Sequence, residues 1–339
     1  MSSFLRIFVT SLSLQNVVLT LAVTTSTHFH RLSTAVTSVM PLLGPLAALA
    51  TSVLWSFTST AFSLAGRRVG SMVVNRIRLL LAVLFLMLTH WVLQGTPMPL
   101  SVSPERWFWL GLSGVIGLII GDALLFQCFV WLGPRLSMLL MSLVPVMSVG
   151  LAWIFLDETL TGLQLLAVGV TIAGVSFVIL DRAGNSAAIV KGKRYALGIL
   201  LGLSSALGQA LGLITAKKGL TGNFSVLSGT LMRMTVAMIL LWLLTFAMRQ
   251  GQETLRRVRQ DSTAMKQLLF GAFSGPFLGV YLSLLAVQLA PVGIASTLMA
   301  LPPIFLLPIS HFVFDEQIGW RAILGTVVAL AGVVLLLWA

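Results

Sequence analysis

The amino-acid sequence predicts an all-α polytopic membrane protein whose ten transmembrane helices form two inverted five-helix repeats. Three observations support this fold class: the apolar composition, the number of long apolar stretches, and an internal repeat. The 339 residues are 58% hydrophobic and 9% charged, whereas soluble proteins are about 45–50% apolar and about 25% charged. A soluble fold of this length could not hide so much apolar surface, so we expect the lipid bilayer to be the main solvent.

Ten apolar stretches are long enough to cross a bilayer, because a transmembrane helix needs about 20 residues. Their expected ranges are 42–65, 74–94, 106–132, 135–155, 162–180, 195–216, 224–247, 267–289, 292–313 and 320–338. The connections between them are short, except for two basic and hydrophilic segments, 181–194 and 248–266. No segment has the composition of a soluble domain.

Residues 1–39 have a different composition, because they are rich in Ser and Thr and contain no Asp or Glu. Leaders that target proteins to organelles share this composition. Met40 stands directly before the first apolar stretch, so a start assigned too early is a second interpretation, and an N-terminal extension or extra helix is a third. The sequence leaves these three alternatives open.

A shift of 158 residues aligns the two halves of the chain at glycine, proline and acidic positions. The aligned pairs are Gly117 with Gly275, Gly121 with Gly279, Pro145 with Pro303, Asp157-Glu158 with Asp315-Glu316, and Gly174 with Gly332. Near the start of each half, a shift of 155 aligns Arg78 with Arg233. We therefore expect a first repeat at 40–181, a basic linker at 182–194 and a second repeat at 195–339.

Each half carries five expected spans, and an odd number forces the second half to enter the membrane inverted. Inverted repeats of this kind are typical of secondary transporters, whose substrate site lies between the repeats near the middle of the bilayer. The repeat is therefore the strongest indication of function that the residues offer on their own.

The formal net charge of +12 does not point to nucleic acid, because the basic residues lie in the gaps between apolar stretches. Loops after odd-numbered spans, with their flanks, carry 15 Lys or Arg, and the opposite side carries three, Arg106, Lys217 and Lys218. The positive-inside rule then places the two long basic connections in the cytoplasm and both ends of the ten-helix core outside. We expect anionic lipid to face the basic loops.

Asp122 is the only acidic residue well inside an expected span. A charged side chain at the bilayer centre costs about 2.5–3.5 kcal/mol on insertion scales, so Asp122 should face the helix bundle or a wet cavity. A carboxyl group there can bind and release a proton, as coupled transport requires. The alternative is a protonated carboxyl that serves packing only. Its partner in the repeat is Val280, so the adjacent Tyr281 is the corresponding polar candidate.

Four glycines of the third and eighth expected spans lie at helical spacing: Gly117, Gly121, Gly275 and Gly279. Small residues let helix backbones approach one another closely. We therefore expect these positions to serve tight helix packing, with a role in gating as the alternative.

Two prolines interrupt the fourth and ninth expected spans at paired positions, Pro145 and Pro303. Each removes a backbone donor and frees the carbonyl four residues before it, at Met141 and Met299. Paired breaks in the two halves are a sequence sign of a transporter cavity. The alternative is a pair of kinks that only shape packing.

Few other polar side chains fall inside the expected spans. Gln127 and Gln209 are candidates for substrate contact, and Trp55 could stack on a substrate, with packing as its more ordinary role. Arg78 and Arg233 lie one to three turns into their spans, and arginines near helix ends usually extend to the headgroups. Arg233 looks the deeper of the two, so an anion site is its alternative. So few polar groups favour a neutral or zwitterionic ligand.

Two paired acidic turns, Asp157-Glu158 and Asp315-Glu316, resemble catalytic carboxylates only in composition. Each precedes the start of an expected helix, where negative charge offsets the positive end of the helix dipole. Thr161 and Gln164 have the spacing of a capping box. We therefore expect these turns to stabilise helix ends.

The stretch Leu139–Leu180 resembles the signature of the EamA family in the drug/metabolite transporter (DMT) superfamily. Its marks are a proline in the fourth span, an acidic turn ending in Glu158, and a glycine-rich fifth span. The stretch Leu298–Leu337 repeats them, so the resemblance covers about residues 42–338. Family members usually have Gly before the turn Glu, where this chain has Asp157. The resemblance implies export or exchange of small metabolites and names no single substrate. It also implies that both ends of the chain lie in the cytosol, which conflicts with the charge count and leaves the topology open.

Together, the repeat and the resemblance predict a secondary active transporter that exports or exchanges a small metabolite, such as an amino acid, around a midplane cavity. A proton is the candidate coupling ion. A facilitator, or an exchanger of the organellar or sugar-phosphate type, is the alternative, and a non-transport membrane protein is a further one.

The sequence favours neither ATP-driven transport nor an enzyme. No G-x-x-x-x-G-K-[ST] loop and no H-E-x-x-H motif occurs, and a second aspartate inside a span is missing. We expect no catalytic residue, no metal and no cofactor, and the bacterial inner membrane as the location. Lipid and a small-molecule substrate are the expected partners, and a homodimer is one oligomeric state open to the chain.

Overall fold

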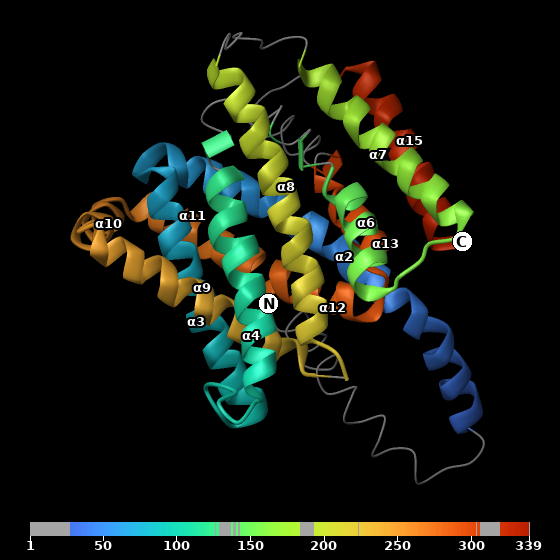
Figure 1. Cartoon of the computed structure of the whole chain (residues 1–339), viewed down its shortest axis with the longest axis horizontal. Helices are drawn as coiled ribbons and strands as arrows, with labels where there is room; N and C mark the ends of the chain where they lie inside the picture. The colour runs from blue at the N-terminus through green and yellow to red at the C-terminus, as the bar shows by residue number, and fades with distance from the viewer. Residues whose placement is uncertain are drawn as a thin grey trace. The chain divides into compact units, whose positions relative to one another are not determined.

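The computed structural model describes residues 28–125, 127–128, 137, 140–141, 143–183, 193–222, 224–302, 304–305 and 319–338. Within these ranges the chain forms helices and turns and contains no strand (Figure 1). The chain divides into a unit of residues 1–43 and a unit of residues 44–339. Described residues of the first unit form the beginning of a helix, and every side chain discussed below belongs to the second unit.

The elements are named by the labels of Figure 1, with η for π-helical segments. In chain order they are α2 (His28–Val69), α3 (Ser71–Gln94), α4 (Pro104–Ser113), η1 (Gly114–Gly121), α6 (Val144–Leu156), α7 (Gly162–Ala183), α8 (Lys193–Gly219), α9 (Val226–Ala247), α10 (Gly251–Gln260), α11 (Ser262–Ala272), η2 (Phe273–Gly279), α12 (Val280–Leu289), α13 (Val292–Met299) and α15 (Trp320–Trp338).

Six helices of the described part of the chain are long and apolar enough to cross a membrane. They are Leu42–Val69, Ser71–Gln94, Pro104–Leu125, Ala196–Gly219, Val226–Ala247 and Ser262–Leu289. Shorter apolar helices occupy Val144–Leu156, Gly162–Phe177 and Ile323–Trp338, within or close to three further expected spans. The all-α polytopic class is confirmed, whereas the count of ten spans stays a prediction.

Two of the long helices contain a wide π-helical segment at the same place in each half of the chain. Segment η1 ends at Gly121 and η2 ends at Gly279, which are partners in the 158-residue repeat. Because a π turn adds a residue to each ring of backbone hydrogen bonds, it changes which residues share a helix face. The even α-helical glycine face that we expected is therefore interrupted in both helices. Single π turns often mark functional sites.

The basic connection 248–266 was expected as a loop, and the structure corrects this. Residues 251–260 form helix α10, and α11 already begins at Ser262. Glu253 pairs with Arg256 and Arg257 along α10, and the Asp261 side chain accepts the Ala264 N–H at 2.9 Å and so caps α11. A hydrogen bond from Arg68, with that from Ala264, lowers the pKa of the Asp261 carboxyl. These local contacts make helix rather than loop the stable form.

Thr161 and Gln164 form the capping box predicted for the start of α7. The Gln164 backbone N–H donates to Thr161 Oγ1 at 3.2 Å, and the Thr161 N–H donates to Gln164 Oε1 at 3.0 Å. Both donors would otherwise lack a partner at the helix start. This prediction is confirmed.

Asp157 ends α6 in the left-handed region, with φ 53°. Glycine occupies this conformation without the clash that a Cβ atom causes, and Asp is one of the few residues that tolerate it. The departure from glycine noted in the sequence therefore falls at a position that favours glycine.

Asp157→Gly is expected to raise the free energy of unfolding by roughly 0.5–1 kcal/mol, because it relieves the left-handed strain. Chemical unfolding of the full-length protein in mixed micelles would measure the change. Asp157→Ala, which keeps the Cβ atom, is the control and should give no gain. Equal effects of Gly and Ala would contradict the explanation.

Helices α7 and α15 pack side by side, and their approach is so close that it requires glycine at the contact (Figure 1). A Cβ atom at Gly174 would lie 2.4 Å from the Ala329 backbone nitrogen, and one at Gly332 would lie 2.4 Å from Thr171 Oγ1. Thr171 and Ala329 are themselves partners at the 158-residue offset. The two contacts are therefore copies of one another, as expected of helices related by an approximate two-fold axis.

Candidate functional site

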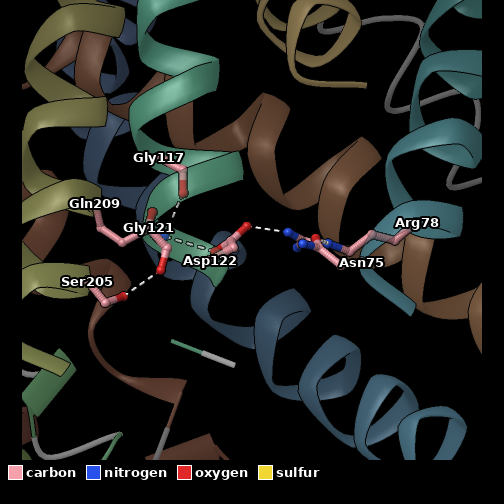
Figure 2. A network of polar contacts seen from close by, with 7 residues as sticks. All are labelled: Asn75, Arg78, Gly117, Gly121, Asp122, Ser205 and Gln209. Carbon is pink, nitrogen blue, oxygen red and sulfur yellow. Dashed lines mark hydrogen bonds and ion pairs between the residues drawn. The ribbon is translucent and has the colours of Figure 1, made fainter. Parts of the chain in front are cut away.

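The segment η1 lies directly against α8, with Gly117 and Gly121 at the contact. The Gln209 amide nitrogen donates to the Gly117 carbonyl at 3.1 Å, and Ser205 Oγ donates to the Gly121 carbonyl at 2.8 Å (Figure 2). Any Cβ atom at Gly117 would lie 3.7 Å from Gly212 Cα. The backbones thus touch, and polar side chains of α8 satisfy carbonyls of the π segment.

The segment η2 lies against α2 in the same manner. A Cβ atom at Gly275 would lie 2.4 Å from Thr58, and one at Gly279 would lie 2.9 Å from Trp55. Thr51 Oγ1 lies 3.4 Å from the Gly279 carbonyl, the counterpart of the Ser205 bond. Trp55 thus packs on Gly279, and its stacking on a substrate stays a prediction.

The two contacts are equivalent residue by residue. A shift of 154 relates Thr51 to Ser205, Trp55 to Gln209 and Thr58 to Gly212. In each contact, the π segment of one half packs on the first helix of the other half. The two halves of the chain are therefore joined by two copies of the same contact.

Asp122 follows η1 and is buried, with 9% of its surface exposed. One carboxylate oxygen accepts a hydrogen bond from Gln209 Nε2 at 2.9 Å, and the other forms an ion pair with Arg78 (Figure 2). Asn75 Oδ1 in turn accepts from Arg78 Nε at 2.9 Å. Side chains from α3 and α8 therefore meet at the end of the π segment, and we call Asn75, Arg78, Asp122 and Gln209 the polar cluster.

Arg233 on α9 adjoins the polar cluster and is 3% exposed. A Cβ atom at Gly117 would lie 2.8 Å from Arg233 Nη2, and one at Gly114 would lie 2.4 Å from the Arg233 carbonyl oxygen. The glycines of η1 thus leave the room that this arginine occupies. The same Cβ atom at Gly117 would lie 3.8 Å from Gln209 Oε1, so Arg233 and Gln209 approach one glycine together.

The expectation that Arg78 extends to the lipid headgroups is wrong, because its side chain is buried and paired with Asp122. Burial of a guanidinium is costly unless a counter-charge accompanies it, and Asp122 is that counter-charge. Only the alignment of Arg78 with Arg233 in the repeat hinted at a shared interior role. The deeper placement expected of Arg233 agrees with its lower exposure.

Helix breaks occur near both proline positions that the sequence singled out. Pro145 lies in the first turn of α6, and Met141 lies before that start, within 3.6 Å of Ser205 Oγ. Helix α13 ends at the buried Met299, and Ser56 donates to the Pro302 carbonyl at 3.2 Å. Pro303 lies outside the described residues.

Tyr281 and Gln127, two further candidates from the sequence, are not part of the polar cluster. Tyr281 is buried in α12, directly after Val280, and Gln127 is exposed. Within the described ranges, no group of three or more His, Cys, Asp or Glu could hold a metal ion.

Glu158 stabilises a helix start in the other half of the chain. Its carboxylate accepts the Val292 backbone N–H at 2.8 Å, at the start of α13, and forms an ion pair with Lys217. Lys217 Nζ also donates to the Ala290 carbonyl at 2.8 Å. The expected structural role is thus present, on α13 instead of α7. The paired turn Asp315-Glu316 lies outside the described residues.

Glu158→Gln is expected to lower the free energy of unfolding by about 1 kcal/mol, because it removes the charge opposite Lys217 and weakens the cap of α13. Glu158→Ala should cost more, since the Val292 N–H then loses its acceptor. Unfolding in mixed micelles measures both. Glu253→Gln, in an exposed pair, is the control with a smaller loss, and equal losses at the two sites would contradict the assignment.

The sequence model of the EamA-like transporter family matches this chain twice, at residues 42–180 and 196–338. No curated protein matches the chain. A solved structure described as "Crystal structure of protein" is similar in fold, with a TM-score of 0.71 and 14% identity over 86% of this chain and 95% of its own. Because the double family match covers most of the chain, and six helices of its described part are long and apolar enough to cross a membrane, this chain belongs to the EamA-like transporter family of the DMT superfamily and is a multi-pass membrane transporter of that type.

Proposed function

We propose that the chain is a secondary active transporter that exports or exchanges a small metabolite, with Asp122 as its coupling residue. In this proposal ten helices form two inverted repeats, 40–181 and 195–339, and the substrate site lies between them. The protein acts without an enzymatic step and resides in the bacterial inner membrane.

The observation that carries the proposal is the pair of equivalent contacts, η1 on α8 and η2 on α2. Alternating access needs two halves that can rock against each other around a site at their interface. The contacts supply such an interface, and glycines keep it close. The polar cluster lies at one of the two contacts, so a change in its charge acts where the halves meet.

Asp122 suits a coupling role because it connects the two halves directly. It lies in the first half, and Gln209 in the second half donates to it. A proton on the carboxylate would remove the charge that attracts Arg78 within the first half and would weaken the hydrogen bond that Gln209 donates from the second half. Proton binding would thereby loosen one contact between the halves, and proton release would restore it.

Charged side chains form contacts at both ends of the helices, in agreement with the proposed topology. At one end, Arg106 donates to the Thr221 carbonyl at 2.8 Å, and Lys217 approaches Glu158. At the other end, Arg68 pairs with Asp261 at 2.7 Å. We propose that the second, more basic end faces the cytoplasm.

An untargeted comparison of released metabolites tests the proposal. Cells that express the intact protein, Asp122→Asn or Glu253→Gln are compared at matched membrane levels. We expect the intact protein and Glu253→Gln to raise a defined set of extracellular compounds, and Asp122→Asn to lose the effect. Glu253 is the control because its exposed carboxylate lies on α10, away from the polar cluster.

Three results would change the proposal in different ways. Release by Asp122→Asn equal to that of the intact protein would keep transport and reduce Asp122 to a packing residue. Absence of any released compound would contradict export. Release that does not depend on a proton gradient would favour the facilitator or exchanger alternative.

A further inference from the structure

The charges around the polar cluster do not balance. Asp122 is the only acidic residue well inside an expected span, yet two buried arginines, Arg78 and Arg233, lie near it. Among the described residues of this site, two guanidinium groups thus accompany the single carboxylate of Asp122. Uncompensated charge in a low-dielectric interior is costly, so a bound anion would stabilise the site.

The hydrogen bonds of the site also favour an anion, because buried donors there lack acceptors. Arg233 Nε and Asn75 Nδ2 are buried, and neither has a hydrogen-bond partner among the described residues. Arg233 and Asn75 are 3% and 1% exposed. Both unsatisfied atoms are donors, and the Asn75 amide cannot simply be turned round, because its oxygen accepts from Arg78. The site thus offers donors that an acceptor oxygen would satisfy.

We propose that the transported compound carries a carboxylate, and that Arg233 binds it beside the Asp122–Arg78 pair. A guanidinium presents its N–H groups as a planar fork that matches the two oxygens of a carboxylate. One carboxylate also balances the excess of one positive charge, whereas a phosphate ester, at about −1.5 to −2, overcompensates it. This inference rests on the proposed transport function and narrows its substrate class to carboxylic acids, including zwitterionic amino acids.

The glycines of η1 give Arg233 its position for this role. Gly117 leaves space for the guanidinium, and its carbonyl is already occupied by Gln209. The Arg233 Nε–H nevertheless has no acceptor among the described residues. A purely structural arginine would instead be expected to donate to the carbonyls around it.

The first part of the test classifies the compounds released in the expression experiment by their chemistry. Compounds with a carboxylate are the expected result. Neutral or cationic compounds without a carboxylate would overturn this inference and leave transport standing. Absence of any release contradicts the proposed function, and this inference falls with it.

The second part measures binding of a released compound to the purified full-length protein in detergent, by titration calorimetry. Its primary amide and inorganic phosphate are the comparison ligands. We expect the acid to bind and the amide to bind at least about tenfold more weakly, because the charge-assisted hydrogen bonds are lost. Equal binding of acid and amide would overturn the inference, and tighter binding of phosphate would replace carboxylate by phosphate as the ligand group.

Variants assign the effect to Arg233. Arg233→Gln should weaken binding of the acid by about tenfold or more, with Arg233→Lys intermediate, since it keeps the charge and loses the fork. Arg76→Gln is the matched control, because Arg76 is also buried, with an Nε that likewise lacks a partner among the described residues, but its other two nitrogens donate to Thr254 at 2.8 Å and to Gln250. A loss of binding in Arg76→Gln equal to that in Arg233→Gln would overturn the assignment.

Asp122→Asn provides a test with the opposite sign. Removal of the negative charge leaves both arginines to the ligand, so we expect the acid to bind more tightly although transport is lost. General damage to the fold would weaken binding in Asp122→Asn as well as in Arg233→Gln. Weaker binding of the acid in Asp122→Asn would therefore overturn the proposed arrangement.

Discussion

Arg78→Met is expected to destabilise the protein by about 3 kcal/mol, more than the double variant Arg78→Met with Asp122→Leu. Loss of one partner of a buried ion pair leaves the other charge uncompensated, at a cost of about 3–5 kcal/mol, whereas replacement of both by apolar groups is often close to neutral. Both side chains are nearly buried, with 11% and 12% exposed, so solvent screens them little. Arg233 remains near Asp122 and offsets part of the loss, which places the expected value at the lower end.

Chemical unfolding of the full-length protein in mixed micelles measures this prediction, with the four members of a double-mutant cycle compared. The double variant should still lose some stability, because Gln209 and Asn75 each lose a partner. A double variant as unstable as Arg78→Met, or more so, would contradict a stabilising charge pair at this position.

Gly174→Ala is expected to lower the free energy of unfolding by about 2 kcal/mol, whereas Gly169→Ala on the same helix should raise it by about 0.5–1 kcal/mol. The new Cβ atom at Gly174 would lie 2.4 Å from a backbone nitrogen and 2.7 Å from the Gly325 carbonyl oxygen of α15. Backbone cannot turn aside as a side chain can, so the helices must separate, and overpacking of this kind costs about 1–3 kcal/mol.

Gly169 is the matched control because nothing lies within 4 Å of an added Cβ atom there. Alanine in a helix then brings only its lower conformational entropy cost, which favours folding. Unfolding of both variants in mixed micelles measures the difference. Gly332→Ala should have a cost similar to that of Gly174→Ala, because its Cβ atom would lie 2.4 Å from Thr171 Oγ1 and also 2.6 Å from the Thr171 backbone nitrogen. Equal effects at Gly174 and Gly169 would contradict the close crossing.

Periodicity and repeat were enough to predict much of the fold. Long apolar stretches gave the class, and the 158-residue offset predicted that Gly174 and Gly332 would be equivalent, as their contacts with α15 and α7 are. The capping box at Thr161 was predictable because both partners lie within one helical turn. In each case the prediction depends on residues close together in the sequence, or on such a pattern that occurs once in each half.

Contacts between distant segments were not predictable in the same way. Arg78 and Asp122 are 44 residues apart, and nothing in one sequence states which helix faces another. Gln209 and Arg233 were named as candidates for their depth, but not as neighbours of Asp122. The π segments also escaped prediction, since glycines at α-helical spacing are compatible with either winding. Helix α10 was missed because its many charges resemble those of a loop.

The two equivalent contacts, η1 on α8 and η2 on α2, have the same backbone geometry but are held by different side-chain interactions. The crossing at Gly121 depends on a carboxylate, a guanidinium and an amide, whereas the crossing at Gly279 depends on an indole ring packed on a bare backbone. Electrostatic attraction of the first kind changes when a charge is added or removed, whereas dispersion forces are almost untouched. Duplication thus provided two matching contacts, and divergence of a few side chains placed charged groups at only one of them.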